Sequence, residues 1–238
     1  MAEKRCVLIT GASRGLGYEL NRLYLERGWT SFPLVRDSAV ADVLRQLFPG
    51  RCHPIIADLA FDDATAQITE AIYNCTKRLD LLINNAGIRG KSYTVDEVSP
   101  REVLDLLQVH CLGTIRCTKA VLPLLRAAEG AKIVNITSRL GSMAWNAAGE
   151  FAGQGFSYSY RIAKAAQNMF TLCLGHELIK EGIVVYGAHP DRLLTALAAD
   201  DAGTQPTIAA ARLIAWIERA DADLVGHCID LENGEIPW

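Results

Sequence analysis

The stretch CVLITGASRGLG, residues 6–17, decides how this chain folds. Its first half, CVLIT, is a short apolar run of the kind that forms a buried strand, and Gly11, Gly15 and Gly17 follow it closely. An amphipathic stretch with helical spacing comes next. Glycines between a strand and a helix let the backbone approach a pyrophosphate, and the helix N-terminus favours the anion. The stretch therefore predicts a dinucleotide-binding turn, with a tight turn that holds no ligand as the alternative.

Short apolar runs and longer amphipathic stretches alternate along the rest of the chain. The pattern predicts about seven strands, at residues 6–10, 31–35, 52–58, 79–87, 131–138, 183–190 and 224–231. It predicts helices at residues 17–28, 40–48, 62–76, 101–127, 158–181 and 207–220. We expect Pro33 to delay the start of the second strand, and Gly113 and Pro123 to interrupt the fourth helix. Residues 139–156 show no clear period.

This alternation is typical of an α/β fold. Strands that are apolar along nearly their whole length belong to a parallel sheet with helices on both faces. Right-handed crossovers then give a single doubly wound, Rossmann-like sheet, and we expect residues 1–238 to form one domain around it. Ligands of such sheets bind beyond the C-terminal ends of the strands. The functional site is therefore expected at that edge of the sheet.

The composition excludes several classes of function. Half of the 238 residues are apolar and the net charge is −3, with no basic run that would suit nucleic acid or an anionic membrane. No stretch approaches the ~20 apolar residues of a membrane span, and the N-terminal apolar run is too short for a signal peptide. The cysteines form no CxxC pair, which favours reduced thiols in a cytoplasmic protein. The histidines are isolated and predict no metal site.

A second stretch, SYSYRIAKAAQ at residues 157–167, contains a candidate acid/base pair. In a helix, residues four apart share a face and residues six apart do not, so Lys164 is coupled to Tyr160 rather than to Tyr158. The phenol pKa of about 10 must fall by about three units for work near neutral pH. One ammonium group at ~4 Å supplies about that much. The alternative is an aromatic residue and a lysine that merely share a helix face.

Five motifs together resemble those of the short-chain dehydrogenase/reductase family, and the match covers nearly the whole chain. The motifs are T-G-x-x-x-G-x-G at Thr10, Gly11, Gly15 and Gly17, the aspartate Asp58 after the third strand, N-N-A-G at residues 84–87, Ser138 after the fifth strand, and Y-x-x-x-K at Tyr160 and Lys164. They stand in the family's order along the chain. SRLGS, SYRIAKAA and the C-terminal IDLENGEIPW resemble the branch that contains bacterial C-factor-like proteins and small carbonyl reductases.

The resemblance implies an oxidoreductase that interconverts a carbonyl and an alcohol with a nicotinamide cofactor. Tyr160 would donate a proton to the carbonyl while hydride is transferred. Lys164 would lower the pKa of the tyrosine and bind the nicotinamide ribose, and Ser138 would hydrogen-bond the substrate oxygen. Thr137 and Ser142 also carry hydroxyl groups, but only Ser138 stands at the strand end in register with the motif.

The implied cofactor site draws on the glycine turn, the strand ends and the segment after the sixth strand. Its residues are Gly11, Ser13, Arg14, Gly15, Leu16, Gly17, Arg36, Asp58, Leu59, Asn85, Ala86, Gly87, Tyr160, Lys164, Pro190, Leu193 and Thr195. An acidic residue at the tip of the second strand would accept from a ribose 2′-OH, but the tip carries Arg36, and Arg14 lies in the glycine turn. Two guanidinium groups suit a 2′-phosphate, so we expect NADP(H) rather than NAD(H). The alternative is that Arg36 is a solvated surface residue, with Asp37 beside it.

Two residues depart from the family's pattern. His110 stands where the family has an asparagine that holds a water linked to the lysine. We expect it to hold that water or relay a proton, with its pKa depressed by Lys164 and activity falling in acid as it is protonated. A histidine that is merely packed is the alternative. Asp191 follows Pro190 where the family has glycine, and an aspartate there could hinder the cofactor or alter the loop.

The chain is thus expected to be an NADP(H)-dependent enzyme acting on a small-molecule ketone or aldehyde. Met143, Trp145, Phe151 and the segment after Thr195 are expected to wall an apolar pocket, which favours a hydrophobic substrate. Tyr158 is expected to be a structural aromatic residue or part of that wall. A nucleotide-binding signalling protein of the C-factor type, with weak or lost catalysis, is the alternative. The sequence is compatible with a homodimer or a homotetramer.

Overall fold

Eight strands form one mixed sheet in the computed structural model, which describes residues 4–194, 203–220 and 222–238. The strands are β1 (Cys6–Thr10), β2 (Thr30–Val35), β3 (Ile55–Ile56), β4 (Leu81–Asn84), β5 (Lys132–Ile136), β6 (Val184–His189), β7 (Cys228–Asp230) and β8 (Gly234–Ile236). Their order is β3-β2-β1-β4-β5-β6-β7-β8, and every pair is parallel except β7 with β8. The winding direction reverses between β1 and β4, which creates a switch point for ligand binding. The expected doubly wound α/β fold is confirmed.

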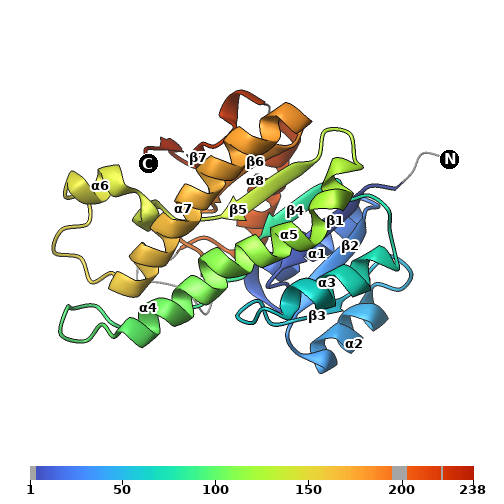
Figure 1. Cartoon of the computed structure of the whole chain (residues 1–238), viewed down its shortest axis with the longest axis horizontal. Coiled ribbons are helices and arrows are strands. Elements are labelled where there is room, and N and C mark those ends of the chain that lie inside the picture. Colours follow the sequence, from blue (N-terminus) through green and yellow to red (C-terminus); the bar gives the residue numbers. More distant parts are fainter. Residues whose placement is uncertain (1–3, 195–202, 221) are drawn as a thin grey trace.

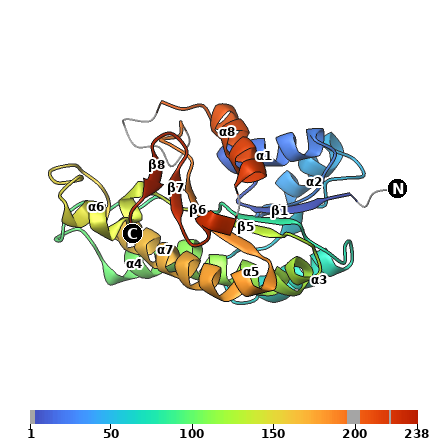
Figure 2. The ribbon, with the colours of Figure 1, turned by 90° about the horizontal axis from the view of Figure 1, so that it is seen from above.

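Helices cover both faces of the sheet (Figures 1 and 2). They are α1 (Gly15–Glu26), α2 (Ser38–Leu47), α3 (Ala64–Tyr73), α4 (Pro100–Leu107), α5 (Gly113–Arg126), α6 (Met143–Ala147), α7 (Tyr158–Leu178) and α8 (Pro206–Arg219). Figure 2 shows α1, α2 and α8 on one side of the sheet and α3, α5 and α7 on the other. In Figure 1, α4 and α6 lie beyond the sheet, at the end away from the N-terminus. No helix among the described residues is long and apolar enough to cross a bilayer.

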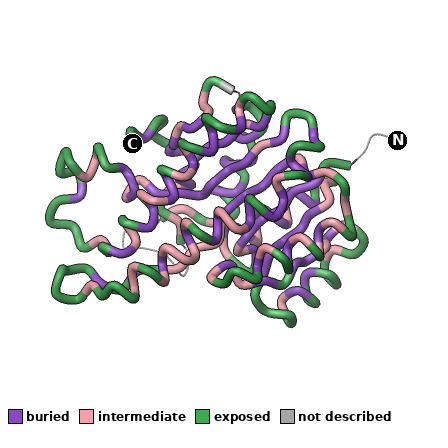
Figure 3. The backbone as a smooth tube through the Cα atoms, in the orientation of Figure 1, coloured by how far each residue is buried: buried purple, intermediate pink, exposed green. Residues whose placement is uncertain are grey.

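The apolar core has two layers, one on each face of the sheet. Along β1, Val7 and Ile9 belong to the layer under α1 and α8, whereas Leu8 belongs to the layer under α3, α5 and α7. Side chains alternate between the two faces of a strand, so a strand covered on both faces is apolar at every position. Figure 3 shows buried residues following the central strands and exposed ones gathering around α4 and α6. The region around α4 and α6 therefore contributes little to the core of the sheet.

Pro33 does not delay β2, which begins at Thr30. Ser31 and Val35 form their backbone hydrogen bonds toward the β3 side, so Pro33 between them faces the same side. Since β3 is only two residues long and pairs with Leu34 and Val35, the missing N–H of Pro33 leaves no ladder partner unsatisfied. The expectation about Pro33 is wrong for this reason.

Residues 101–127 are interrupted near Gly113, as expected, but not at Pro123. A π-helical turn, η1 (Gln108–Leu112), joins α4 to α5, and α5 then runs through Pro123 to Arg126. Pro123 lies in the last turn of α5, where a missing N–H removes a single helical hydrogen bond. Two further features were not expected: the antiparallel edge strand β8, and the short helical pieces η2 (Arg139–Gly141) and α6 inside the aperiodic loop.

Candidate active site

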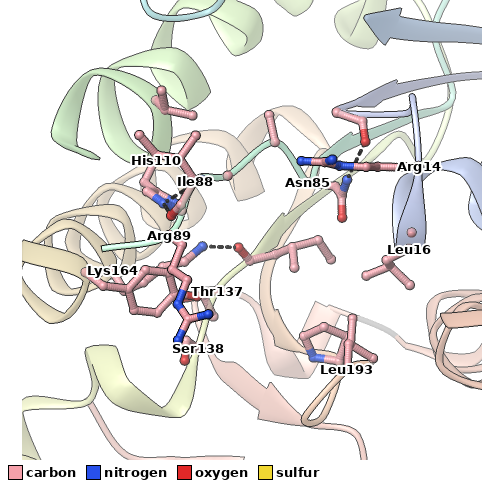
Figure 4. Close-up of a pocket in the computed structure, with 18 of the residues that line it drawn as sticks. Arg14, Leu16, Asn85, Ile88, Arg89, His110, Thr137, Ser138, Lys164 and Leu193 are labelled. Carbon is pink, nitrogen blue, oxygen red and sulfur yellow. Dashed lines mark hydrogen bonds between the residues drawn. The ribbon is translucent and has the colours of Figure 1, made fainter. Parts of the chain in front are cut away.

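A cleft of about 1020 Å³ lies at the carboxyl ends of β1, β2, β4, β5 and β6 (Figure 4). The expected residues that line it are Gly11, Ser13, Arg14, Gly15, Leu16, Arg36, Asp58, Leu59, Asn85, Ala86, Gly87, His110, Ser138, Tyr160, Lys164, Pro190 and Leu193. Figure 4 shows Arg14 and Leu16 at one end of the cleft and Ser138 and Lys164 at the other. Gly17 is not among the lining residues, and Thr195 falls outside the described ones.

The glycine turn at the first end is set by close backbone packing. Gly11 has a φ of +67°, and a Cβ there would lie 2.8 Å from the Cα of Ala86. A Cβ at Gly17 would clash with the carbonyl oxygen of Gly11. Gly17 therefore supports the turn by allowing close packing against Gly11, although it does not line the cleft itself. Arg14 precedes α1 without capping it through its side chain. The first N–H groups of α1 therefore lack a side-chain cap and suit an anion.

The acidic side chains near Arg36 are already engaged. Asp37 is the N-cap of α2, where its carboxylate accepts from the N–H of Ala39 at 2.8 Å. Asp58 accepts from the N–H of Ala60 at 3.0 Å and lies 3.9 Å from the Arg36 guanidinium. The side chain of Arg36 remains 69% exposed. Arg36 is thus a surface residue that also lines the cleft, and Asp37 offers no carboxylate to a ribose.

Ser138 and Tyr160 meet at the other end of the cleft. Ser138 follows β5 and caps η2, accepting from the N–H of Leu140 at 3.2 Å. Tyr160 lies in the first turn of α7, whose N-cap Ser157 accepts from the Tyr160 N–H at 3.3 Å. Burial raises the pKa of Tyr160 to about 12, while a hydrogen bond with Ser138 acts in the opposite direction. Burial and the Ser138 hydrogen bond act on this pKa without a contribution from Lys164, so the expected lowering by Lys164 is not met.

Lys164 is almost fully buried beneath Tyr160. Its ammonium group lies 5.7 Å from the centre of the Tyr160 ring, so the two residues share a helix face as their spacing predicts. The group donates to the carbonyl oxygen of Ile136 at 2.7 Å and to Gln167 Oε1 at 2.8 Å. Burial lowers the pKa of Lys164 to about 7. Tyr158, by contrast, is 43% exposed and does not line the cleft.

His110 lies in the π-helical turn η1 and is 1% exposed. Its Nε2 lies 3.2 Å from the N–H and 2.9 Å from the carbonyl oxygen of Ile88, and its Nδ1 has no partner. The ring meets that of Tyr160 edge-on. Burial, and secondarily the charge of Lys164, lowers the pKa of His110 to about 3. The expected direction is right, but the expected loss of activity on protonation would fall well below neutral pH, because burial adds to the effect of Lys164.

The segment after β6 is held by Asp191. This residue has a φ of 80°, a left-handed conformation that an aspartate tolerates better than most residues. Its carboxylate accepts from the Thr204 hydroxyl and from the N–H of Arg192, at 2.6 Å for the latter, and lies 3.9 Å from Arg212. The side chain thus ties the two described ends of the segment together. Whether Asp191 hinders the cofactor or alters the loop relative to glycine stays a prediction.

Three of the expected wall residues do not line the cleft, and the segment after Thr195 falls outside the described residues as far as residue 202. The three residues are Met143, Trp145 and Phe151; Phe151 is buried against Trp145 and Phe156 instead. The apolar residues that line the cleft include Ile88, Leu140, Phe156 and Leu194. The aperiodic loop folds partly upon itself, and no periodicity in its sequence could show which of its apolar residues face inward.

Four further residues of the site were not expected from the sequence. Arg89, Arg139 and His189 line the cleft, and Gln167 holds Lys164. Arg139 directly follows Ser138, Arg89 comes two residues after the N-N-A-G motif, and Gln167 is three residues after Lys164 on the same helix face, so spacing alone could have suggested them. Within the part of the chain that the structure describes, no group of three or more His, Cys, Asp or Glu side chains is placed to hold a metal ion.

Comparison with known proteins identifies the family. A family model described as short chain dehydrogenase matches residues 5–205. The chain belongs to the short-chain dehydrogenase family. Within the family, it is 32% identical to the rhamnolipids biosynthesis 3-oxoacyl-acyl-carrier-protein reductase of Pseudomonas aeruginosa, over 97% of this chain and 95% of that protein. It is 31% identical to the C-signal protein of Myxococcus xanthus, over 69% of this chain and 95% of that one.

Solved structures of short-chain dehydrogenases show the same architecture. The carbonyl reductase Sniffer of D. melanogaster superposes with a TM-score of 0.89 at 28% identity, covering 99% of this chain and all of that one. The RhlG/NADP active-site complex of Pseudomonas aeruginosa superposes with a TM-score of 0.81 at 26% identity, covering 96% of this chain and 95% of that one. The resemblance seen in the sequence motifs, including its C-factor and carbonyl reductase branches, is confirmed.

Proposed function

We propose that residues 1–238 form one NADP(H)-binding domain that interconverts a carbonyl compound and an alcohol. The observation that carries this proposal is the group of Ser138, Tyr160 and Lys164 at one end of a cleft whose other end is a glycine turn; Ser138 and Lys164 are buried and Tyr160 is half-buried. Family membership and the carbonyl reductase neighbour support it. Together these features fit a site in which a nicotinamide and a carbonyl meet next to a proton donor.

The cleft fits a dinucleotide with a 2′-phosphate. The start of α1, which no side chain caps, would receive the pyrophosphate, and the tight contact of Gly11 with Ala86 keeps the turn close to it. Arg14 and Arg36 would pair with the 2′-phosphate, since Asp37 is committed to capping α2. The NADP complex of the Pseudomonas aeruginosa relative supports the same choice. When bound, NADPH supplies the hydride for carbonyl reduction.

The pKa of Tyr160 fits the role of proton donor. Because burial raises that pKa to about 12, the phenol keeps its proton at neutral pH and can give it to the carbonyl oxygen as negative charge develops there. The Ser138 hydroxyl would donate a hydrogen bond to the same oxygen. The reverse reaction would need the phenolate, which burial disfavours.

Lys164 would stabilise the phenolate that remains on Tyr160 after proton transfer. Its ammonium group is close to the ring and is fixed by Ile136 and Gln167, so little side-chain freedom is lost in the reaction. His110 would hold the Ile88 backbone and the edge of the Tyr160 ring in place while remaining neutral. In this role His110 acts through its neighbours, and its unpaired Nδ1 is the atom available to hold a water.

The substrate would be a ketone or aldehyde with an apolar body. Ile88, Leu140 and Phe156 offer apolar surface next to the Ser138 and Tyr160 hydroxyls. The test is NADPH consumption with a panel of ketones and aldehydes, together with NADPH binding by fluorescence. We expect turnover of at least one hydrophobic carbonyl compound. Binding of NADPH without turnover of any of them would contradict the enzymatic role.

A nucleotide-binding regulatory protein is the second candidate. The similarity to the C-signal protein favours it, because that relative carries a name that describes signalling. The complete set of Ser138, Tyr160 and Lys164 in one cleft weighs toward catalysis. The same two measurements separate the candidates, since a regulatory protein would bind NADPH and leave the carbonyl panel unchanged.

We also propose that the chain acts in the cytoplasm and forms a homodimer or a homotetramer. Leu104 of α4 and Tyr158, Ile162 and Met169 of α7 are large apolar side chains exposed to solvent, and such surface favours self-association. Size-exclusion chromatography with light scattering tests the assembly: a mass of two or four chains is expected, and a mass of one chain would contradict it.

A further inference from the structure

Two arginines stand beside the proposed proton donor without being needed for the reaction or the cofactor. Arg89 and Arg139 both line the cleft together with Ser138 and Tyr160. Figure 4 shows the Arg89 side chain extending into the cleft on the side of Ser138 and Lys164, at the end opposite Arg14 and Leu16. These cations are remote from the end of the cleft where the two cofactor arginines lie.

The backbone on both sides of Arg89 is fixed. Ile88 is held by His110, whose Nε2 lies within hydrogen-bonding distance of both the N–H and the carbonyl oxygen of Ile88 and bonds one of them in a given tautomer. Gly90 packs so tightly on Ser157 that a Cβ there would overlap its hydroxyl. The next N–H, of Lys91, donates to Glu102 at 2.7 Å. The backbone that carries the Arg89 side chain is therefore already ordered, so a bound ligand would not have to order residues 88–91.

The guanidinium of Arg89 has no acidic partner among the described residues. Its recorded contact is a hydrogen bond to the Tyr93 hydroxyl at 3.3 Å, and Tyr93 also lines the cleft. Arg139 extends over the Phe151 ring at 5.6 Å, next to Ser138 in the chain. Consecutive Cα atoms are about 3.8 Å apart, so the Arg139 backbone lies beside the residue that would hold the substrate oxygen.

Among the described residues that line the cleft, no acidic side chain pairs with Arg89. Glu19 and Asp58 lie with the glycine turn and the tip of β2. Asp191 is nearer, but its carboxylate is engaged by Thr204, Arg192 and Arg212. A protein whose overall net charge is −3 thus presents positive charge where its substrate would bind. A concentrated charge of one sign within a cleft attracts ligands of the other sign.

We propose that the carbonyl substrate carries a carboxylate a few carbon atoms from its carbonyl group, and that Arg89 pairs with that carboxylate. The proposal rests on the proposed function. An arginine fork matches the two oxygens of a carboxylate. The apolar side chains Ile88, Leu140 and Phe156 would contact the carbon chain between and beyond the two groups.

The experiment compares oxo acids with their neutral esters at saturating NADPH, using acetoacetate and levulinate against methyl acetoacetate and methyl levulinate. The parent protein is expected to have the higher kcat/KM for the acids, mainly through KM. Arg89→Gln is expected to lower the ratio of acid to ester kcat/KM by about tenfold to a hundredfold, as for a lost hydrogen bond to a charged group. Arg89→Lys should keep part of the ratio because it keeps the charge.

Arg101→Gln is the matched control, because this exposed arginine of α4 pairs with Asp105 outside the cleft. It removes the same charge from the protein and should leave the ratio unchanged. A parent ratio near one, or a ratio that Arg89→Gln does not move, would overturn the proposal. A carbonyl carrying a phosphate ester that is reduced in preference to the oxo acids would overturn the choice of a carboxylate.

A binding measurement separates this proposal from the proposed function. Valerate is a carboxylate that has no ketone group and so cannot be a substrate. It is titrated calorimetrically into the protein loaded with NADP⁺. Binding that Arg89→Gln weakens at least about tenfold supports the carboxylate site even if no carbonyl is turned over. Turnover of the esters together with valerate binding that is equal in the parent and Arg89→Gln overturns the carboxylate site and leaves the carbonyl reductase standing.

Discussion

The two ends of the cleft are built in different ways. At the cofactor end, the main chain sets the shape: Gly11 and Gly17 allow close backbone packing, and the charged Arg36 stays 69% exposed. At the catalytic end, side chains set the chemistry: Lys164 is 4% exposed and His110 is 1% exposed. Burial shifts the pKa of both groups there, and that of Tyr160 as well. One end depends on backbone shape and exposed charge, and the other on the burial of ionisable groups.

The difference shows how substitutions should act at each end. Exposed arginines interact with a ligand charge through solvent, so their removal weakens binding without changing the pH at which the protein works. Buried groups exchange protons with the solvent at shifted pH values, so their removal changes pH dependence as well as rate. The predictions below test this distinction, beginning with the largest effect.

Removing the proton donor should produce the largest loss. Tyr160→Phe keeps the ring against His110 and removes the hydroxyl, so turnover of a carbonyl substrate should fall at least ~100-fold with NADPH affinity nearly unchanged. Tyr158→Phe is the matched control, because Tyr158 is exposed outside the cleft. A greater loss in Tyr158→Phe than in Tyr160→Phe would reverse the assignment.

Removing a cofactor arginine should act on affinity alone. Arg36→Gln is expected to weaken NADPH binding by about 1.5–3 kcal/mol, as for a hydrogen bond to a charged group, and at the lower end because the side chain is exposed. NADH binding should change little, and the pH profile should keep its shape. The control is Arg45→Gln on α2, an arginine paired with Asp42 outside the cleft. Equal affinity of the parent for NADH and NADPH would show that the 2′-phosphate is not recognised.

His110 should make the protein sensitive to acid. An unfolded histidine takes up a proton near pH 6.5, whereas burial keeps the pKa of His110 at about 3 in the folded chain. As pH falls through 6.5, the unfolded state therefore gains protons that the folded state does not, and stability is lost. When the pH is lowered from about 7 to 5, the free energy of unfolding of the parent should fall by about 2 kcal/mol more than that of His110→Asn.

Urea unfolding at the two pH values measures this effect. His176→Asn is the control, because His176 is exposed on α7 and should leave the pH dependence of the parent unchanged. Equal acid sensitivity in the parent and His110→Asn would mean that His110 takes up its proton in the folded state.

Sequence reasoning served the cofactor end better than the catalytic end. The glycine spacing and the strand order define backbone geometry, which depends on residue type in a direct way, so the turn around Gly11 and the switch point beside β1 could be predicted. Burial depends on the whole fold. No local pattern could show that Phe151 packs inward, that Pro33 faces a gap in the β3 ladder, or that burial raises the pKa of Tyr160. Gln167 and Arg89 stand at informative spacings from motif residues, but what they contact becomes visible only in three dimensions.

The most direct test of the account is the pH dependence of carbonyl reduction in the parent and in Lys164→Arg. Only the ammonium form of Lys164 can stabilise the Tyr160 phenolate, and burial lowers its pKa to about 7. The kcat/KM of the parent should therefore be highest below about pH 7 and fall as the pH rises through this value. An arginine stays charged at every working pH, so Lys164→Arg should lower the maximum yet move the alkaline fall upward by at least about two pH units. An alkaline fall at the same pH in both proteins would contradict the account.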